Sequence, residues 1–163
     1  GAELALERKR LRARAEFELG DADGALRLLA RDQSHDADLL RADIFWRTQR
    51  WAQAAEVFQR LVGRSGQDGR RIDERAATLI LNWAVSLSLS SNLEQLSRVR
   101  QIFTQQMDNT PFREAFRLIT NKTEGELDDF RTLADRFGEI GRFQAFLTSY
   151  RDRLKDKPLS STN

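Results

Sequence analysis

The stretch that decides the fold is Ala13-Arg-Ala-Glu-Phe-Glu-Leu-Gly-Asp-Ala-Asp-Gly-Ala-Leu-Arg-Leu-Leu29, in which two helical segments flank a Gly-Asp turn. When it is moved along the chain by 29 positions, its key residues fall on similar ones: Ala13 on Ala42, Leu11 on Leu40, Ala25 on Ala54, and Leu29 on Phe58. A further shift of 42 positions gives a weaker third match: Ala42 on Ala84, Trp51 on Leu93, and Ala54 on Leu96. Such self-similarity predicts stacked helical units that bury their apolar faces against one another.

Helical periodicity extends beyond these units, and no segment alternates apolar and polar residues as a strand would. We predict about nine helices. The first five cover about residues 3–19, 22–31, 36–48, 51–62 and 72–89. The sixth ends near residue 107 and the seventh near residue 120. Ser91 and Glu94 have the spacing of a capping box and predict the start of the sixth helix. Thr110 and Pro111 predict the start of the seventh.

The predicted domain organisation follows from these helices. Residues 1–2 lack an initiator Met and predict a cloning scar on an excised C-terminal domain, so the cytoplasm and the periplasm both remain open. Residues 3–107 form the helical hairpins. Residues 108–156 form capping helices of the same domain, the last two rich in Phe, and residues 157–163 form a disordered tail.

The repeated units resemble the tetratricopeptide repeat (TPR) family, whose repeats place a small residue in the first helix, a Gly-Asp type turn, and Ala followed by a large apolar residue in the second. The matching residues are Ala13, Gly20, Ala25 and Leu29 in one unit and Ala42, Phe45, Ala54 and Phe58 in the next. The period here is 29 residues at first, where the family has 34. Three stretches, 81–85, 115–120 and 143–147, also resemble the C-terminal part of large uncharacterised bacterial TPR proteins. The resemblance implies an all-α, right-handed α-solenoid of antiparallel helical hairpins with a helical cap.

Composition excludes several kinds of chemistry. The chain has 163 residues, 27 basic and 25 acidic, with a net charge of +2, one histidine and no cysteine. Disulfides and thiolate metal sites are therefore excluded. His35 is interpreted as a turn residue, because no partner for a general base can be identified. We expect no enzyme activity, no metal and no cofactor. The longest apolar stretch, residues 79–89, is too short to cross a bilayer, so we expect no membrane insertion.

The strongest local charge feature is the basic run of residues 8–14. Arg10 and Arg14 share one helical face, whereas Arg8 and Arg12 point about 100° away. Three interpretations stay open for this run: a solvated face paired with nearby glutamates, a contact surface for an acidic peptide, and a nucleic-acid site. Aromatic residues that could stack on bases are not interleaved with the run, which disfavours nucleic acid.

The family resemblance implies a concave groove lined by the first helix of each hairpin. The residues that would line it are Arg10, Arg14, Phe17, Leu39, Asp43 and Trp46. Placement of Phe17 and Trp46 in the core is an equal alternative. The predicted function is protein binding, as an adaptor or scaffold that holds a peptide or partner helix. Nucleic-acid binding through residues 8–14 and self-association with other copies remain as alternatives.

Overall fold

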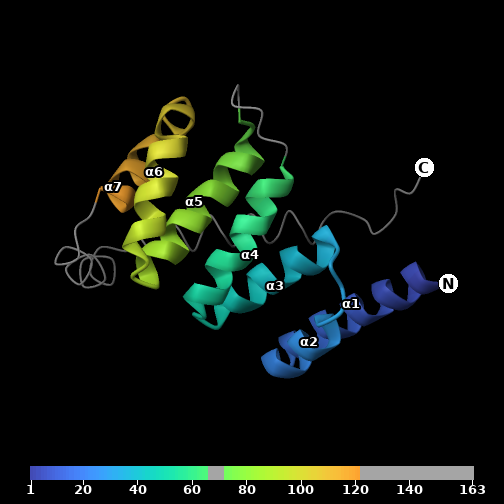
Figure 1. The fold of residues 1–163 in the computed structure, drawn as a ribbon. Coiled ribbons are helices and arrows are strands. Elements are labelled where there is room, and N and C mark those ends of the chain that lie inside the picture. The colour runs from blue at the N-terminus through green and yellow to red at the C-terminus, as the bar shows by residue number, and fades with distance from the viewer. Residues whose placement is uncertain (66–71, 122–163) are drawn as a thin grey trace. The chain divides into compact units, whose positions relative to one another are not determined.

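The computed structural model describes residues 1–65 and 72–121, and all regular structure in these ranges is α-helical (Figure 1). This confirms the predicted all-α class for the described part. The helices are α1 (Ala2–Glu18), α2 (Ala22–Leu29), α3 (His35–Arg47), α4 (Trp51–Arg64), α5 (Glu74–Leu89), α6 (Leu93–Met107) and α7 (Arg113–Thr120). The predicted eighth and ninth helices and the C-terminal tail lie outside the described residues. The chain divides into units Gly1–Lys122 and Thr123–Asn163, and all described helices, including α7 of the predicted cap, belong to the first.

The same turn joins the helices of three successive pairs, α1–α2, α3–α4 and α5–α6. Each turn has one residue with a left-handed backbone: Gly20 (φ 97°), Gln49 (φ 57°) and Ser91 (φ 59°). In each, the next backbone N–H donates to a carbonyl five residues back: Asp21 to Glu16 (2.9 Å), Arg50 to Phe45 (2.8 Å), and Asn92 to Leu87 (2.9 Å). This is the Schellman arrangement, which satisfies carbonyls left free at a helix end. The turns recur at the 29- and 42-residue shifts of the sequence repeat.

Small buried residues allow the two helices of a hairpin to approach closely. Alanines at the repeated positions are at most 6% exposed: Ala13, Ala42 and Ala84 in the first helices, and Ala25 and Ala54 in the second. The third hairpin has Leu96 in place of the second alanine, also buried. The pairing of α5 with α6 is correspondingly less extensive than that of α1 with α2. A larger side chain at this position keeps two helices further apart than alanine does, in agreement with the less extensive pairing.

α5 is buried along most of its length. Every residue from Ala76 to Ser88 is buried, and the helix contacts α4, α6 and α7. The repeat shift carries the α3 positions of the predicted groove onto Leu81, Val85 and Ser88, which are all covered. An open face therefore does not continue from α3 onto α5. None of the described helices is both long enough and apolar enough to cross a membrane.

The predicted capping box at Ser91 is wrong. Ser91 takes the left-handed position that ends α5, and Asn92 caps α6 by accepting from the backbone N–H of Gln95 at 3.2 Å. The Schellman turn needs Ser91 in this conformation, so it cannot also serve as the extended residue before the next helix. Thr110 likewise accepts from Phe112 N–H at 3.2 Å in a turn that precedes α7.

Candidate partner-binding surface

The predicted groove residues of the second hairpin lie on one face of α3. Leu39, Asp43 and Trp46 are spaced by four and three residues, which places them on the same side of a helix, and all three are half-buried. On α1, which contacts α3, the side chain of Arg14 is exposed and has no ion-pair partner among the described residues. We call these four residues the α1/α3 face.

Arg47 links α3 to α1 beside this face. Its guanidinium carbon lies 4.4 Å from the centroid of the Phe17 ring, a cation–π contact. The same guanidinium donates to Glu18 at 3.0 Å and lies 3.7 Å from a carboxylate oxygen of Asp43. Phe17 is only 8% exposed. The sequence left open whether Phe17 lines the groove or lies in the core, and in the structure it lies in the core.

Trp46 takes part in packing as well as in the surface. Its ring meets that of Trp51 edge to face, with 5.1 Å between centroids, and that of Phe58 in the same way at 5.9 Å. Both partners belong to α4, so Trp46 packs α3 against the second helix of its own hairpin. Because Trp46 is half-buried, part of its surface remains open to a partner.

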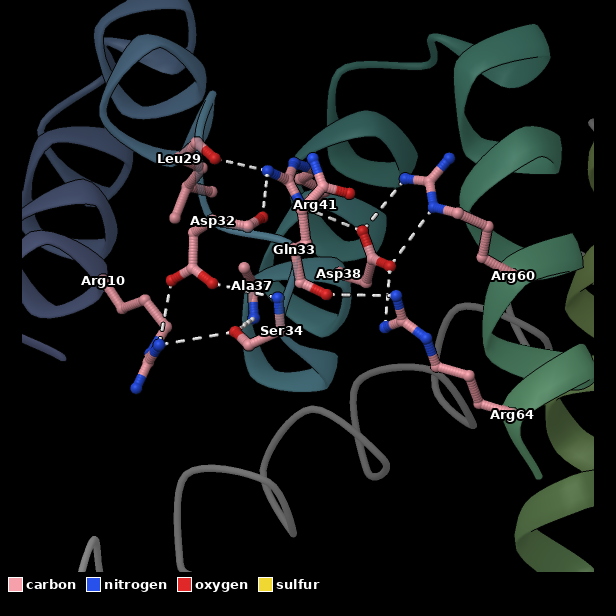
Figure 2. Close-up of polar contacts among 10 residues, drawn as sticks. All are labelled: Arg10, Leu29, Asp32, Gln33, Ser34, Ala37, Asp38, Arg41, Arg60 and Arg64. Atoms are coloured by element: carbon pink, nitrogen blue, oxygen red, sulfur yellow. Dashed lines mark hydrogen bonds and ion pairs between the residues drawn. The ribbon is translucent and has the colours of Figure 1, made fainter. Parts of the chain in front are cut away.

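Arg10, predicted to line the groove, is bound within the fold (Figure 2). One terminal nitrogen donates to Asp32 at 2.8 Å and to the Ser34 hydroxyl at 3.3 Å, and the other donates to Glu3 at 3.0 Å. The side chain of Arg10 is 14% exposed. Its charge is therefore compensated from within, and it ties α1 to the loop before α3.

Asp38 lies at the centre of a second cluster, in which three arginines meet one carboxylate (Figure 2). Arg41 donates to Oδ1 at 2.9 Å, and Arg60 of α4 donates to both oxygens at 2.9 and 3.2 Å. A terminal nitrogen of Arg64 lies 3.0 Å from Oδ2. The carboxylate side chain is 2% exposed, whereas Arg60 and Arg64 are 44% and 38% exposed. A carboxylate buried to this degree stays ionised only because it is paired.

These arginines also hold the loop between α2 and α3. Arg41 donates to the carbonyl of Leu29 and, at 2.6 Å, to that of Asp32, while Arg64 donates to the Gln33 carbonyl at 3.0 Å. α1 and α2 pack on α3 less extensively than α4 packs on α5, so these bonds contribute much of the junction between the first two hairpins. We call the set the aspartate–arginine network: Arg10, Asp32, Asp38, Arg41, Arg60 and Arg64.

The network lowers the pKa of both of its carboxyl groups. Burial by itself would raise the pKa of Asp38, but hydrogen bonds from Arg60 and Arg41 and their positive charges outweigh it. Burial likewise opposes ionisation of Asp32, and hydrogen bonds from Ser34 and Arg10 outweigh it, so the pKa of Asp32 is also lowered. Both groups are therefore ionised at neutral pH.

We expect the protein to lose stability in acid as these two aspartates take up protons. Because the folded pKa values lie below the unfolded value of about 3.9, the unfolded state binds more protons in that range. Their contribution is complete above the unfolded pKa and is lost as pH falls through the folded values. Urea unfolding midpoints measured from about pH 6 to about pH 2 test this. An Asp38→Asn variant with the same pH slope as the wild type would contradict it.

Asp32 and Asp38 were not among the predicted site residues, although the position of Asp38 on its helix indicated a buried charge. Asp38 lies four residues before the buried Ala42 and therefore shares its side of α3. A carboxylate on the buried side of a helix requires a charged partner. Helical spacing points to Arg41, three residues further along α3, as one partner. It could not identify Arg60, which is 22 residues away on another helix.

His35 is the first residue of α3 and is exposed, and Ser34 caps that helix by accepting from the Ala37 N–H at 3.2 Å. Within residues 1–65 and 72–121, no three His, Asp or Glu side chains are grouped so that they could hold a metal ion.

The chain matches no family model, and comparison with curated proteins and with solved structures finds no significant match. The repeated turns, the α1/α3 face and the aspartate–arginine network are therefore the features from which a function can be inferred.

Proposed function

We propose that this chain is a non-catalytic protein-binding module, a stack of helical hairpins of the TPR-like kind that holds a peptide or a partner helix. The observation that carries the proposal is the recurrence of one Schellman turn at the shifts of the sequence repeat. Repeated hairpins bind partners on the surface formed by their first helices. In this chain such a surface is limited to the first helices of the first two hairpins, α1 and α3, which contact each other.

The α1/α3 face is the surface that we propose for the partner. It combines apolar side chains, Leu39 and Trp46, with the charges of Arg14 and Asp43, a mixture typical of peptide-binding surfaces. Arg10 and Phe17 are no longer included, because the first is bound in the network and the second is buried under Arg47. Their role is to hold the face in position.

Partial compensation of the basic run weakens the nucleic-acid alternative. Arg10 is paired with Asp32 and Glu3, and Arg12 with Glu16, so part of the positive charge of the run is neutralised within the protein. Backbone phosphates of a nucleic acid are bound mainly by uncompensated Lys and Arg. We therefore retain protein binding as the proposed function.

Selection of displayed peptides on the folded chain tests this proposal. We expect selected peptides to bind Leu39→Glu and Arg14→Glu variants at least about tenfold more weakly than the wild type, because both changes fall on the α1/α3 face. Ile102→Glu and Arg100→Glu are matched controls, since both residues are exposed on α6. Equal binding by the face variants and the controls would refute the site. Thermal unfolding verifies that each variant is folded.

A further inference from the structure

A shallow depression of about 220 Å³ lies between the first two helices. It is lined by Lys9 of α1, Arg27 and Leu28 of α2, and Ala30 and Arg31, which follow α2. Three of the five lining side chains are therefore basic, and none is acidic. The depression belongs to the face of the first hairpin where α1 meets α2, and it shares no lining residue with the α1/α3 face.

The three basic side chains of this depression have no counter-charge within the described part of the chain. Lys9, Arg27 and Arg31 make no side-chain hydrogen bond or ion pair with any described residue. The neighbouring carboxylate of Asp32 is directed elsewhere, since its oxygens accept from Arg10 and from the backbone of Ser34. Three like charges around one hollow repel one another, and an anion placed among them would remove that repulsion.

The second hairpin provides an internal template for such a site. The 29-residue shift carries Lys9 onto Asp38, Arg27 onto Glu56, and Arg31 onto Arg60. In the second hairpin, the carboxylate of Asp38 binds the guanidinium of Arg60 across the two helices at 2.9 Å. In the first hairpin the residue that corresponds to Asp38 is Lys9, so no described residue supplies an acidic partner for Arg31.

We propose that this depression binds a phosphate group, which takes the place that the Asp38 carboxylate has in the second hairpin. Two guanidiniums four residues apart, Arg27 and Arg31, can each donate two parallel hydrogen bonds to phosphate oxygens. Lys9 adds a point charge from the opposite helix. The double negative charge of a phosphate monoester matches three cations better than a carboxylate does.

The last carbonyl of α2, that of Leu29, opposes a nearby anion less than a free carbonyl would. Free carbonyls at a helix C-terminus carry partial negative charge. Here the Leu29 carbonyl accepts from the Arg41 guanidinium and from the Asp32 N–H at 2.9 Å, so it is already satisfied. The inference is independent of the proposed peptide-binding face, because it uses other residues.

Titration of the ¹⁵N-labelled chain with inorganic phosphate tests the site. We expect the Nε–Hε signals of Arg27 and Arg31 to shift together and to saturate. Lys9→Asp supplies the acidic group of the second hairpin and should weaken phosphate binding at least about tenfold. Arg100→Asp is the matched control, because it makes the same change in net charge at an exposed arginine on α6 that has no ion-pair partner among the residues described. It should bind phosphate like the wild type.

Three results would overturn the proposal. They are shifts that do not saturate, equal weakening by Lys9→Asp and Arg100→Asp, and shifts spread evenly over all exposed arginines. A second variant, Arg31→Ala, keeps the test decisive if Lys9→Asp fails to fold, since it should also lose saturable binding. Arms with a phosphoserine peptide and with phosphatidic acid vesicles identify the source of the phosphate, and stronger binding of either than of its phosphate-free counterpart supports the site.

Discussion

Replacement of Asp38 by alanine is expected to lower the free energy of unfolding by about 3–5 kcal/mol, the usual cost of breaking a buried ion pair from one side. The carboxylate is 2% exposed and is the shared acceptor of three guanidiniums. Arg41, itself 13% exposed, would remain in the interior without its charged acceptor. Arg41 and Arg64, which also bind carbonyls of the loop between the first two hairpins, would lose the carboxylate that holds them in place.

The buried carboxylate and the more exposed arginines of the network should differ in how much their removal destabilises the protein. Arg60 and Arg64 are 44% and 38% exposed, so water already weakens their ion pairs with Asp38. Changing either arginine to alanine should therefore lower the free energy of unfolding by only about 0–1 kcal/mol. Asp36→Ala is the matched control, because Asp36 is an exposed carboxylate in the first turn of the same helix. Urea denaturation measures all four variants. A cost for Asp38→Ala no larger than that for Asp36→Ala would contradict the central role of Asp38.

Phe58→Ala is the second large effect, with an expected loss of about 3–5 kcal/mol. Phe58 is 5% exposed and meets Trp46 edge to face at 5.9 Å, so its removal leaves a cavity between α3 and α4. Phe58→Leu should cost clearly less, since the equivalent position of the first hairpin is occupied by the fully buried Leu29. The comparison therefore tests the repeat as well as the packing.

Urea denaturation and near-ultraviolet circular dichroism measure this second prediction. The centroids of the Trp46 and Trp51 rings lie 5.1 Å apart. Loss of the Phe58 ring beside Trp46 should alter the near-ultraviolet circular dichroism of this pair. Gln59→Ala, at an exposed neighbouring position on α4, serves as the control and should leave both readouts nearly unchanged. Equal stability of Phe58→Ala and Gln59→Ala would show that the α3–α4 packing is not as described.

The helices and turns were predictable where the signal is local. The shifts of 29 and 42 residues identified the positions of the three Schellman turns, because their bonds join residues at most five apart. The same turns explain the local error at Ser91. Gln49 and Ser91 take a left-handed backbone that costs roughly 1–2 kcal/mol for a residue other than glycine, so sequence preference alone pointed to a different role.

The candidate surface was predictable only in part. Helical spacing grouped Leu39, Asp43 and Trp46 on one side of α3, where all three are half-buried. The same spacing grouped Arg10 and Phe17 with Arg14, although the first pairs with Asp32 and the second lies under Arg47. Spacing reports the direction of a side chain from its own helix, and the neighbours it meets belong to other helices.

The amino-acid sequence by itself determined the helices and repeated hairpins of the described residues, because helix periodicity, caps and turns depend on residues within a few positions of one another. Only the tertiary structure decided which charges are compensated and which remain open. Arg10 and Asp32, like Arg60 and Asp38, are 22 residues apart and meet only when several helices have packed. Among residues 1–65 and 72–121, that packing leaves Lys9, Arg27 and Arg31 without an acidic partner, although the sequence has nearly equal numbers of acidic and basic residues.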